Sequence, residues 1–303
     1  MIMFVKRLII SLLSSLIFFN IHANILIEDD TISTSIEAKI SKIDTLSHIE
    51  LYTTFLSKVS YIGRYYGTSG IGLYPTIAYK HKSGFEMNIS NNVWTGFTPI
   101  FNQSELNLSY SKNLFSWFGI GVGYARTFMY YGSDSDKLAM PNALNLNFGL
   151  YLGLANVGID YSYMFGYDKA SALHVGISKD YTIYKFWGSD KVTISPGLGG
   201  YWAPQTVFYH YFSKNAVKKI NRGQQIKATG KGHGQSGSTA DTYNEGSALQ
   251  TLDYQINLPI NYRIGHCVFE IAYHLDFPLN LPADYLYGSS PLSTFTGYIK
   301  YIF

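Results

Sequence analysis

The chain alternates apolar with polar or small residues over successive segments of about ten residues, and turn residues separate these segments. The last segment, residues 293–303, shows the pattern clearly. Its apolar parity consists of Phe295, Gly297, Ile299, Tyr301 and Phe303. Because successive side chains of a β-strand point to opposite faces, each segment predicts a strand with one apolar face and one wet face. Segments of this length and pattern are typical of transmembrane β-barrels, although a soluble β-sandwich also alternates.

Composition decides between these two folds when it is read together with the strand length. The chain has 303 residues, of which 47% are hydrophobic, 17% aromatic and only 14% charged, so a disordered chain is excluded. Outside the extreme N-terminus no run reaches the roughly 18 apolar residues of a membrane helix, which excludes a helical membrane protein. The segments also exceed the usual strand length of about five or six residues. Together these features favour the transmembrane barrel.

The first 23 residues predict an export signal. Lys6 and Arg7 precede an apolar stretch, residues 8–19, and Ala23 is a small residue at which a signal peptidase can cut. An uncleaved anchor is the alternative. We expect residues 24–54, which alternate less clearly, to be a periplasmic lead-in.

Twelve strands are predicted between residue 55 and the C-terminus, an even number as in bacterial single-chain barrels. Their ranges are 55–66, 70–80, 84–94, 103–111, 116–130, 142–152, 156–167, 170–180, 190–202, 248–262, 266–277 and 292–303. The connection after every second strand is short, whereas the other set contains the long ones, including residues 203–247. Outer-membrane barrels have short periplasmic turns and longer extracellular loops. The sequence therefore predicts an all-β fold, a single antiparallel transmembrane β-barrel in a Gram-negative outer membrane and in contact with its lipid, with a periplasmic N-terminus.

Two short motifs resemble a known group of proteins. Residues 60–67 (SYIGRYYG) and 79–85 (YKHKSGF) are similar to the opening hairpins of uncharacterised outer-membrane barrel proteins of the Bacteroidota. The resemblance implies location and fold, and it assigns no chemistry. The terminal Phe303, on the apolar parity, resembles the last residue of strands that such barrels present to their assembly machinery, which implies that machinery as a partner.

Polar residues on the inward parity of two predicted strands, 248–262 and 266–277, form a candidate site in the lumen. Its members are Asp253, Gln255, Asn257, His266, Glu270, His274 and Asp276. Two His and several carboxylates can bind a divalent metal or act as acid and base, but a hydrogen-bonded network that keeps charges paired is the simpler interpretation. Further charged residues with inward parity are Lys58, Arg64, Lys80, Glu86, Glu105, Asp160, His174 and Asp180. Their mixed signs argue against a strongly ion-selective pore.

Glycines line one side of two predicted strands. Gly119, Gly121 and Gly123 share a parity, as do Gly197 and Gly199. Because no helix follows them, they do not form a phosphate-binding loop. Small inward residues either permit strong sheet curvature or leave room for a solute or a plug, and the sequence leaves these alternatives open.

The long loop, residues 203–247, is basic and flexible in composition. Its cations are Lys214, Lys218, Lys219, Arg222, Lys227 and Lys231. Such a loop can bind an anionic surface polymer, fold inward to narrow the lumen, or remain solvated without structure. The formal net charge of the whole chain is only +3, so we expect no nucleic-acid partner.

These features favour a passive pore or small-solute channel. The first alternative is a sealed barrel whose extracellular loops bind a surface polymer or a partner. The second is a barrel hydrolase that uses the cluster around His274, although no GxSxG motif is present. We predict no cofactor, no bound metal and no catalytic residue. The single cysteine, Cys267, excludes an intramolecular disulfide framework.

Overall fold

The computed structural model contains β-strands in the residues that it describes, which are 46–58, 60–61, 64–65, 70–95, 101–129, 140–186, 190–204, 249–280 and 291–303. Its strands are β1 (His48–Leu56), β2 (Ser60–Tyr61), β3 (Arg64–Tyr65), β4 (Gly72–Lys80), β5 (Phe85–Trp94), β6 (Phe101–Phe115), β7 (Phe118–Met129), β8 (Asn142–Tyr151), β9 (Asn156–Phe165), β10 (Lys169–Ser178), β11 (Tyr181–Tyr184), β12 (Asp190–Ile194), β13 (Gly197–Ala203), β14 (Gln250–Ile264), β15 (Cys267–Pro278) and β16 (Leu292–Ile302). No helix in the described residues is long and apolar enough to cross a membrane. The predicted signal, residues 1–23, lies outside them.

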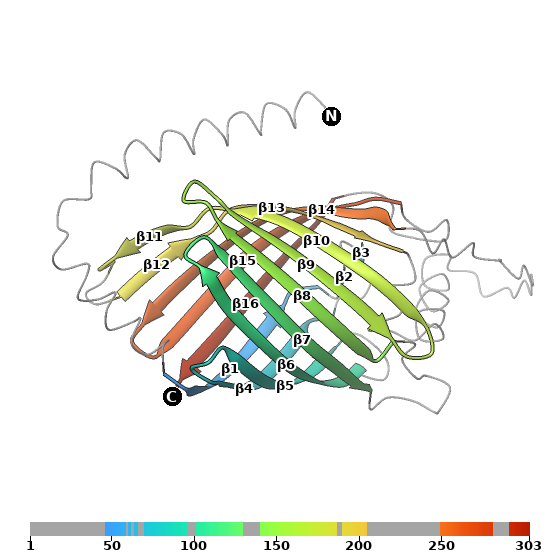
Figure 1. Ribbon diagram of the computed structural model, residues 1–303, viewed down its shortest axis with the longest axis horizontal. Helices are drawn as coiled ribbons and strands as arrows, with labels where there is room; N and C mark the ends of the chain where they lie inside the picture. The colour runs from blue at the N-terminus through green and yellow to red at the C-terminus, as the bar shows by residue number, and fades with distance from the viewer. Residues whose placement is uncertain are drawn as a thin grey trace, which may run out of the picture. The chain divides into compact units, whose positions relative to one another are not determined.

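Twelve of the described strands close into one antiparallel barrel (Figure 1). The order around the barrel is β1, β4, β5, β6, β7, β8, β9, β10, β13, β14, β15 and β16. Strand β16 pairs with β1, with Ile299 opposite Thr53 and Ile302 opposite Glu50, and this pairing closes the ring. Short strands β11 and β12 form a hairpin that prolongs β10 and β13, and β12 continues the pairing with β14. The predicted twelve-stranded, all-β barrel is confirmed.

The two ends of the barrel differ in the length of their connections. At the end that we call the turn end, residues 81–84, 116–117, 152–155, 185–189 and 265–266 join successive strands. At the opposite end, the loop end, the connections include residues 57–71, 130–141, 204–249 and 279–291. Gly84, at one of the turns, has a φ of +98°, and a Cβ added to it would lie 1.9 Å from the Ser111 carbonyl oxygen, so this turn requires glycine.

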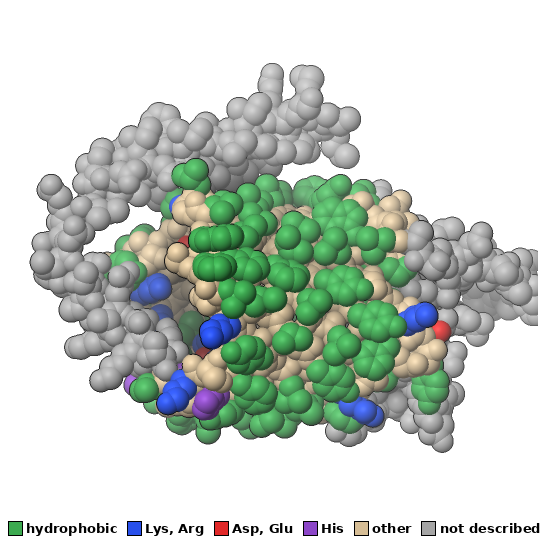
Figure 2. Space-filling view, viewed as in Figure 1, with side chains coloured by type: hydrophobic (Ala, Val, Ile, Leu, Met, Phe, Trp, Pro, Cys, Tyr) green, Lys and Arg blue, Asp and Glu red, His purple; other side chains and the backbone are tan. Residues whose placement is uncertain are grey.

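Side chains alternate between the two faces of the barrel as the sequence indicates. On β5, Met87 and Ile89 are exposed on the outer face, whereas Glu86 and Asn88 form polar contacts on the inner face. Figure 2 shows apolar side chains spread over the visible outer face of the barrel. A closed sheet leaves no unpaired edge, and its apolar outer face suits it to lipid. This is the architecture of an outer-membrane β-barrel.

The position of the first strand differs from the prediction. The alternation predicts it at residues 55–66 and predicts a lead-in at residues 24–54, but β1 is His48–Leu56 and pairs with both β4 and β16. Its inner face carries His48 and Glu50, so charged residues masked the alternation. The described residues of the motif at 60–67, which are 60–61 and 64–65, form a small separate sheet, β2 with β3.

Two predicted turns are also shifted. Residues 111–115 belong to β6, which runs on to a turn at residues 116–117. Residues 181–184 form β11 rather than the start of a turn. The predicted strand 190–202 is divided at Pro196, which has no N–H to donate to a neighbouring strand. Polar residues at a strand end resemble turn residues in sequence, because both meet water.

The outer face can be tested with two neighbouring residues on β5. Ile89 is 55% exposed on the outer face, and Ser90 follows on the inner face. We expect Ile89→Lys to lower the free energy of unfolding by about 2–4 kcal/mol, the range for a cation on the lipid face near the bilayer midplane. The measurement is urea-induced unfolding in lipid vesicles.

The matched control is Ser90→Lys, which places the same cation inside the barrel and should cost less than about 1 kcal/mol because the interior is polar. Equal losses in the two variants would contradict the assignment of the two faces.

Candidate functional site

The residues of the predicted lumen cluster lie on the inner face of β14 and β15, with the exception of His266. Gln255 pairs with Asp276, and Asn257 pairs with His274, across these two strands. Their chain neighbours Tyr254, Leu258, Phe269 and Ile271 are exposed on the outer face. These side chains share the inner face of the two strands, but the structure does not gather them into one site.

The first group lies near the loop end. Asp253 is fully buried and Asp276 is 5% exposed. The amide of Gln255 donates a hydrogen bond to Asp253 Oδ2 at 3.2 Å. This group combines two buried carboxyl groups with one amide.

The second group centres on His274, halfway along the wall. Its Nδ1 lies 2.8 Å from Asn257 Oδ1, and its Nε2 lies 2.8 Å from the Thr296 hydroxyl. The order hydroxyl, imidazole, amide matches the arrangement of a nucleophile, its base and an orienting group. Acyl transfer also needs free N–H donors for the oxyanion. Because β16 is paired on both sides, with β1 and with β15, the backbone around Thr296 is engaged in the sheet. This wall therefore gives the hydrolase hypothesis no support.

The remaining two members of the cluster lie toward the turn end. Glu270 accepts a hydrogen bond from the Asn261 amide at 2.5 Å. His266 lies in the turn, where its Nδ1 contacts the Ile302 carbonyl oxygen at 2.7 Å and its ring stacks on Tyr301. His266 thus belongs to the rim rather than to the wall. Among the described residues, no three His, Cys, Asp or Glu side chains lie close enough together to hold a metal ion.

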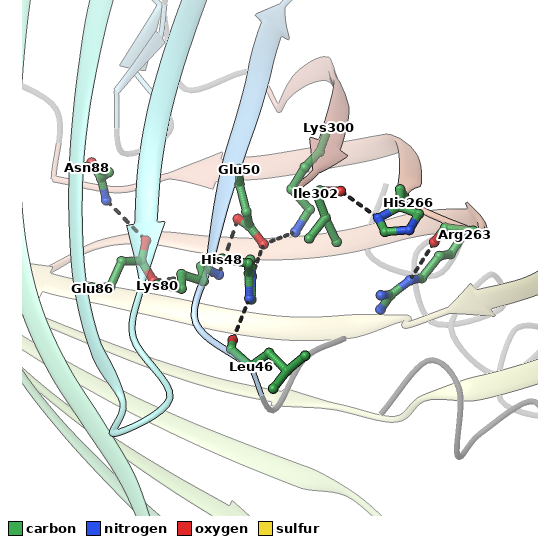
Figure 3. Close-up of polar contacts among 11 residues, drawn as sticks. Leu46, His48, Glu50, Lys80, Glu86, Asn88, Arg263, His266, Lys300 and Ile302 are labelled. Carbon is green, nitrogen blue, oxygen red and sulfur yellow. Dashed lines mark hydrogen bonds and ion pairs between the residues drawn. The ribbon is translucent and has the colours of Figure 1, made fainter. Parts of the chain in front are cut away.

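A charged centre that the sequence pattern does not predict lies at the closing seam of the barrel (Figure 3). The Glu50 side chain, 5% exposed, accepts a hydrogen bond from Lys300 Nζ at 3.3 Å and forms an ion pair with Lys80 at 3.4 Å. His48 Nε2 lies 3.3 Å from the same carboxylate. Lys80 also pairs with Glu86 at 3.6 Å. Inward parity identified Lys80 and Glu86, but Glu50 was hidden in the supposed lead-in.

Other inward charges are paired locally. Asp160 accepts a hydrogen bond from Asn147 at 2.7 Å and contacts His174 Nδ1 at 3.1 Å, and the His174 ring stacks on Tyr201. A Cβ on Gly199 would lie 2.8 Å from His174 Nε2, so glycine makes room for this ring.

The remaining charged residues with predicted inward parity are Glu105, Asp180, Lys58 and Arg64. Glu105 accepts from Asn107 at 2.7 Å, and Asp180 accepts from Asn156 at 3.2 Å. Lys58, in the connection after β1, donates to the Ser293 carbonyl oxygen. The Arg64 side chain lies outside the described residues, as do all six cations of the basic loop, so the predictions for that loop remain predictions.

Part of the barrel wall near the loop end is apolar rather than wet. A buried cluster contains Ala125, Met140, Ala143, Met164, Ala170, Ala203 and Leu252. Leu252 shares its parity in the sequence with Tyr254 and Leu258 of the outer face, but a bulge pairs Tyr201 with Asp253 and Trp202 with Thr251, so Leu252 is skipped. The bulge changes the parity at this point and brings Leu252 into the buried cluster.

A cavity of about 380 Å³ lies against the wall formed by β6, β7 and β8 near the turn end. Inward-parity residues that line it include Ser109, Ser111, Asn113, Gly121 and Asn147. In Figure 2 the barrel is hollowed at the left, the turn end, with Lys and Arg side chains at the margin. The volume of the cavity is at the lower end of the range of about 300–1,000 Å³ for small-molecule sites.

Comparisons with known proteins found similarity in structure only. No family model matches the sequence, and no curated protein matches it. A KdgM porin is 13% identical, with 84% of this chain and 99% of that chain covered and a TM-score of 0.47. The β domain of the Bordetella autotransporter BrkA is 10% identical, with 85% and 100% covered and a TM-score of 0.45. An outer membrane channel from Pseudomonas putida F1 is 9% identical, with 85% and 96% covered and a TM-score of 0.45. These similarities concern the barrel fold and extend to no ligand or activity of this chain.

The charged centre at the seam predicts a stability effect. Glu50→Gln removes the carboxylate from between Lys80 and Lys300 and leaves their charges facing each other. Removing one partner of a buried pair costs about 3–5 kcal/mol, and the partial exposure of Lys80 lowers our expectation to about 2–3 kcal/mol. Unfolding by urea in vesicles measures this loss.

Glu86→Gln is the matched control, since Glu86 is more exposed and has a single 3.6 Å ion pair with Lys80. We expect a loss below about 1 kcal/mol there. An unchanged stability of Glu50→Gln, with the barrel intact, would contradict the role of this centre.

Proposed function

We propose that the chain is an outer-membrane β-barrel that acts as a passive pore for small hydrophilic solutes. The proposal rests above all on the cavity of about 380 Å³ on the inner wall, lined at its inward positions by Ser, Asn, Gly and Tyr residues. An apolar outer face and a polar inner face support it, because a water-filled path through lipid needs both. The charges of the inner wall have mixed signs, and those around the seam form ion pairs, which suits a pore with little ion selectivity.

The orientation in the membrane is part of the proposal. Bacterial barrels of this kind have short periplasmic turns and longer extracellular loops. The turn end would therefore face the periplasm, together with the start of β1 and the end of β16. Cleavage of residues 1–23 would leave a periplasmic N-terminus, and the basic segment, residues 203–247, would be extracellular.

The terminal strand supports an outer-membrane location in a further way. Phe303 is exposed on the outer face, its ring contacts Tyr301, and its N–H donates to the Ile49 carbonyl oxygen at 2.9 Å. We propose that the barrel-assembly machinery recognises this strand before it pairs with β1.

Single-channel recording in planar bilayers tests the pore. We expect stepwise conductance in KCl with weak preference between K⁺ and Cl⁻, because the described inner wall carries charges of both signs. Heat-modifiable migration in gels, performed on the same preparation, verifies that the protein is folded.

The same recording is made on a variant in which a short Gly-Ser turn replaces residues 205–248, which keeps β13 and β14 intact. Folded protein that conducts in neither form would refute the pore.

A further inference from the structure

The charges of the inner wall are unevenly distributed in the turn-end half of the barrel. One arc, formed by β14, β15, β16, β1, β4 and β5, carries them on its inner face. They include Arg263, Glu270, Lys300, Glu50, Lys80 and Glu86. The opposite arc, β6 to β8, has only Asn, Ser, Gly and Tyr at the described inward positions of this half, from Asn107 to Asn113, from Gly119 to Gly123 and from Asn145 to Tyr151. The cavity lies against this uncharged arc.

The charged side chains at the two borders of the uncharged arc form hydrogen bonds or ion pairs with neighbouring residues. On one side, Glu86 pairs with Lys80 and accepts a hydrogen bond from Asn88. On the other side, Asp160 is engaged by Asn147 and His174. Lys112 also borders the cavity, but its parity places its side chain on the outer face of β6. The side chains that line the cavity at its inward positions are therefore neutral, and the Asp160 carboxylate beside Asn147 is hydrogen-bonded to that amide and contacts His174.

Neither backbone conformation nor packing explains the glycine at the centre of this arc. Gly121 has no positive φ, and a Cβ added to it would lie 3.4 Å from Asn147 Oδ1 and 3.5 Å from Ser111 Cβ, which are ordinary contact distances. Gly199 differs, because its added Cβ would overlap His174. The effect of glycine at position 121 is to leave open volume in the cavity.

We infer that this cavity is the solute path in the turn-end half of the barrel and that it takes uncharged, hydroxyl-rich solutes. The inference rests on the proposed pore function and names the solute class. Asn amides and Ser hydroxyls both donate and accept hydrogen bonds, so they replace the water around a sugar-like hydroxyl. A charged solute on the same wall loses hydration and gains no counter-charge, which is costly.

Efflux from proteoliposomes tests the solute class. The radiolabelled probes are glucose, gluconate and glucosamine, which are similar in size and differ in charge. We expect glucose to leave roughly threefold or more faster than either charged probe, because only the charged probes lose ionic hydration at the uncharged wall. Equal rates for the three probes would overturn the solute class while leaving the pore intact.

A matched pair of variants on β7 tests the path. Gly121→Phe fills the cavity, whereas Val122→Phe adds a similar side chain on the outer face of the same strand. Val122 also borders the cavity, but its side chain is 49% exposed on the outer face. We expect Gly121→Phe to lower glucose efflux at least roughly threefold, since an aromatic ring would take up much of the open volume, and Val122→Phe to leave it unchanged. Normal efflux in Gly121→Phe would overturn the path.

A labelling experiment covers the case in which Gly121→Phe does not fold. In a Cys267→Ser background, which has no other thiol, Gly121→Cys is folded first and then modified with a bulky methanethiosulfonate reagent. Modification should reduce glucose efflux as the Phe variant would, and unchanged efflux after complete labelling would overturn the path. If the unmodified protein passes neither ions nor glucose, the proposed function and this inference both fail.

Discussion

The pairing of β1 with β16 is the contact on which the rest of the structure depends. Inside lipid, an unpaired backbone N–H or carbonyl group costs several kcal/mol, so a sheet is stable there only when its first and last strands meet. The seam joins residues that are about 250 positions apart in the chain, with Glu50 opposite Ile302 and Leu56 opposite Thr296. Its side chains reinforce it, because the Glu50 carboxylate on β1 bridges Lys300 on β16 and Lys80 on β4. Closure of the backbone and pairing of the buried charges thus occur at the same place.

Once the sheet is closed, the alternation of side chains along its strands gives it one face that meets lipid and one face that meets water. The outer face carries large apolar side chains, and the inner face divides into three regions. These are the charged arc around Glu50, the uncharged arc along β6 to β8, and the apolar cluster that contains Met164 and Leu252 near the loop end. The proposed solute path follows the uncharged arc because small inward residues leave a cavity along it. Function in this account depends on which side chains are small and neutral, more than on any catalytic group.

The fold could be predicted from sequence because lipid imposes a simple rule on each strand: apolar residues that face lipid alternate with residues that face the interior. In β16 and β8 the rule is followed without interruption, and the predicted faces agree with the structure. The rule failed at β1, where His48 and Glu50 occupy the inner face and resemble a soluble segment. It failed at Leu252 because one bulged residue changes the parity, and such a bulge depends on the neighbouring strand. The sequence could predict the face on which the residues of the candidate cluster lie, but parity does not give the height of a residue along the barrel wall. His274 and Asp276 share the inner face of β15 but lie at different heights along it, and His266 lies in the turn before β15.

The central claim is that successive residues of a barrel strand meet lipid and water in turn. Spin labels placed singly at positions 293 to 302 of β16, in a Cys267→Ser background in lipid vesicles, measure this directly through collisions with oxygen and with a water-soluble nickel complex. The account predicts a two-residue period, with oxygen favoured at Phe295, Ile299 and Tyr301 and nickel favoured at the residues between them. Uniform access of the nickel complex, or a period near that of a helix, would contradict the barrel in lipid.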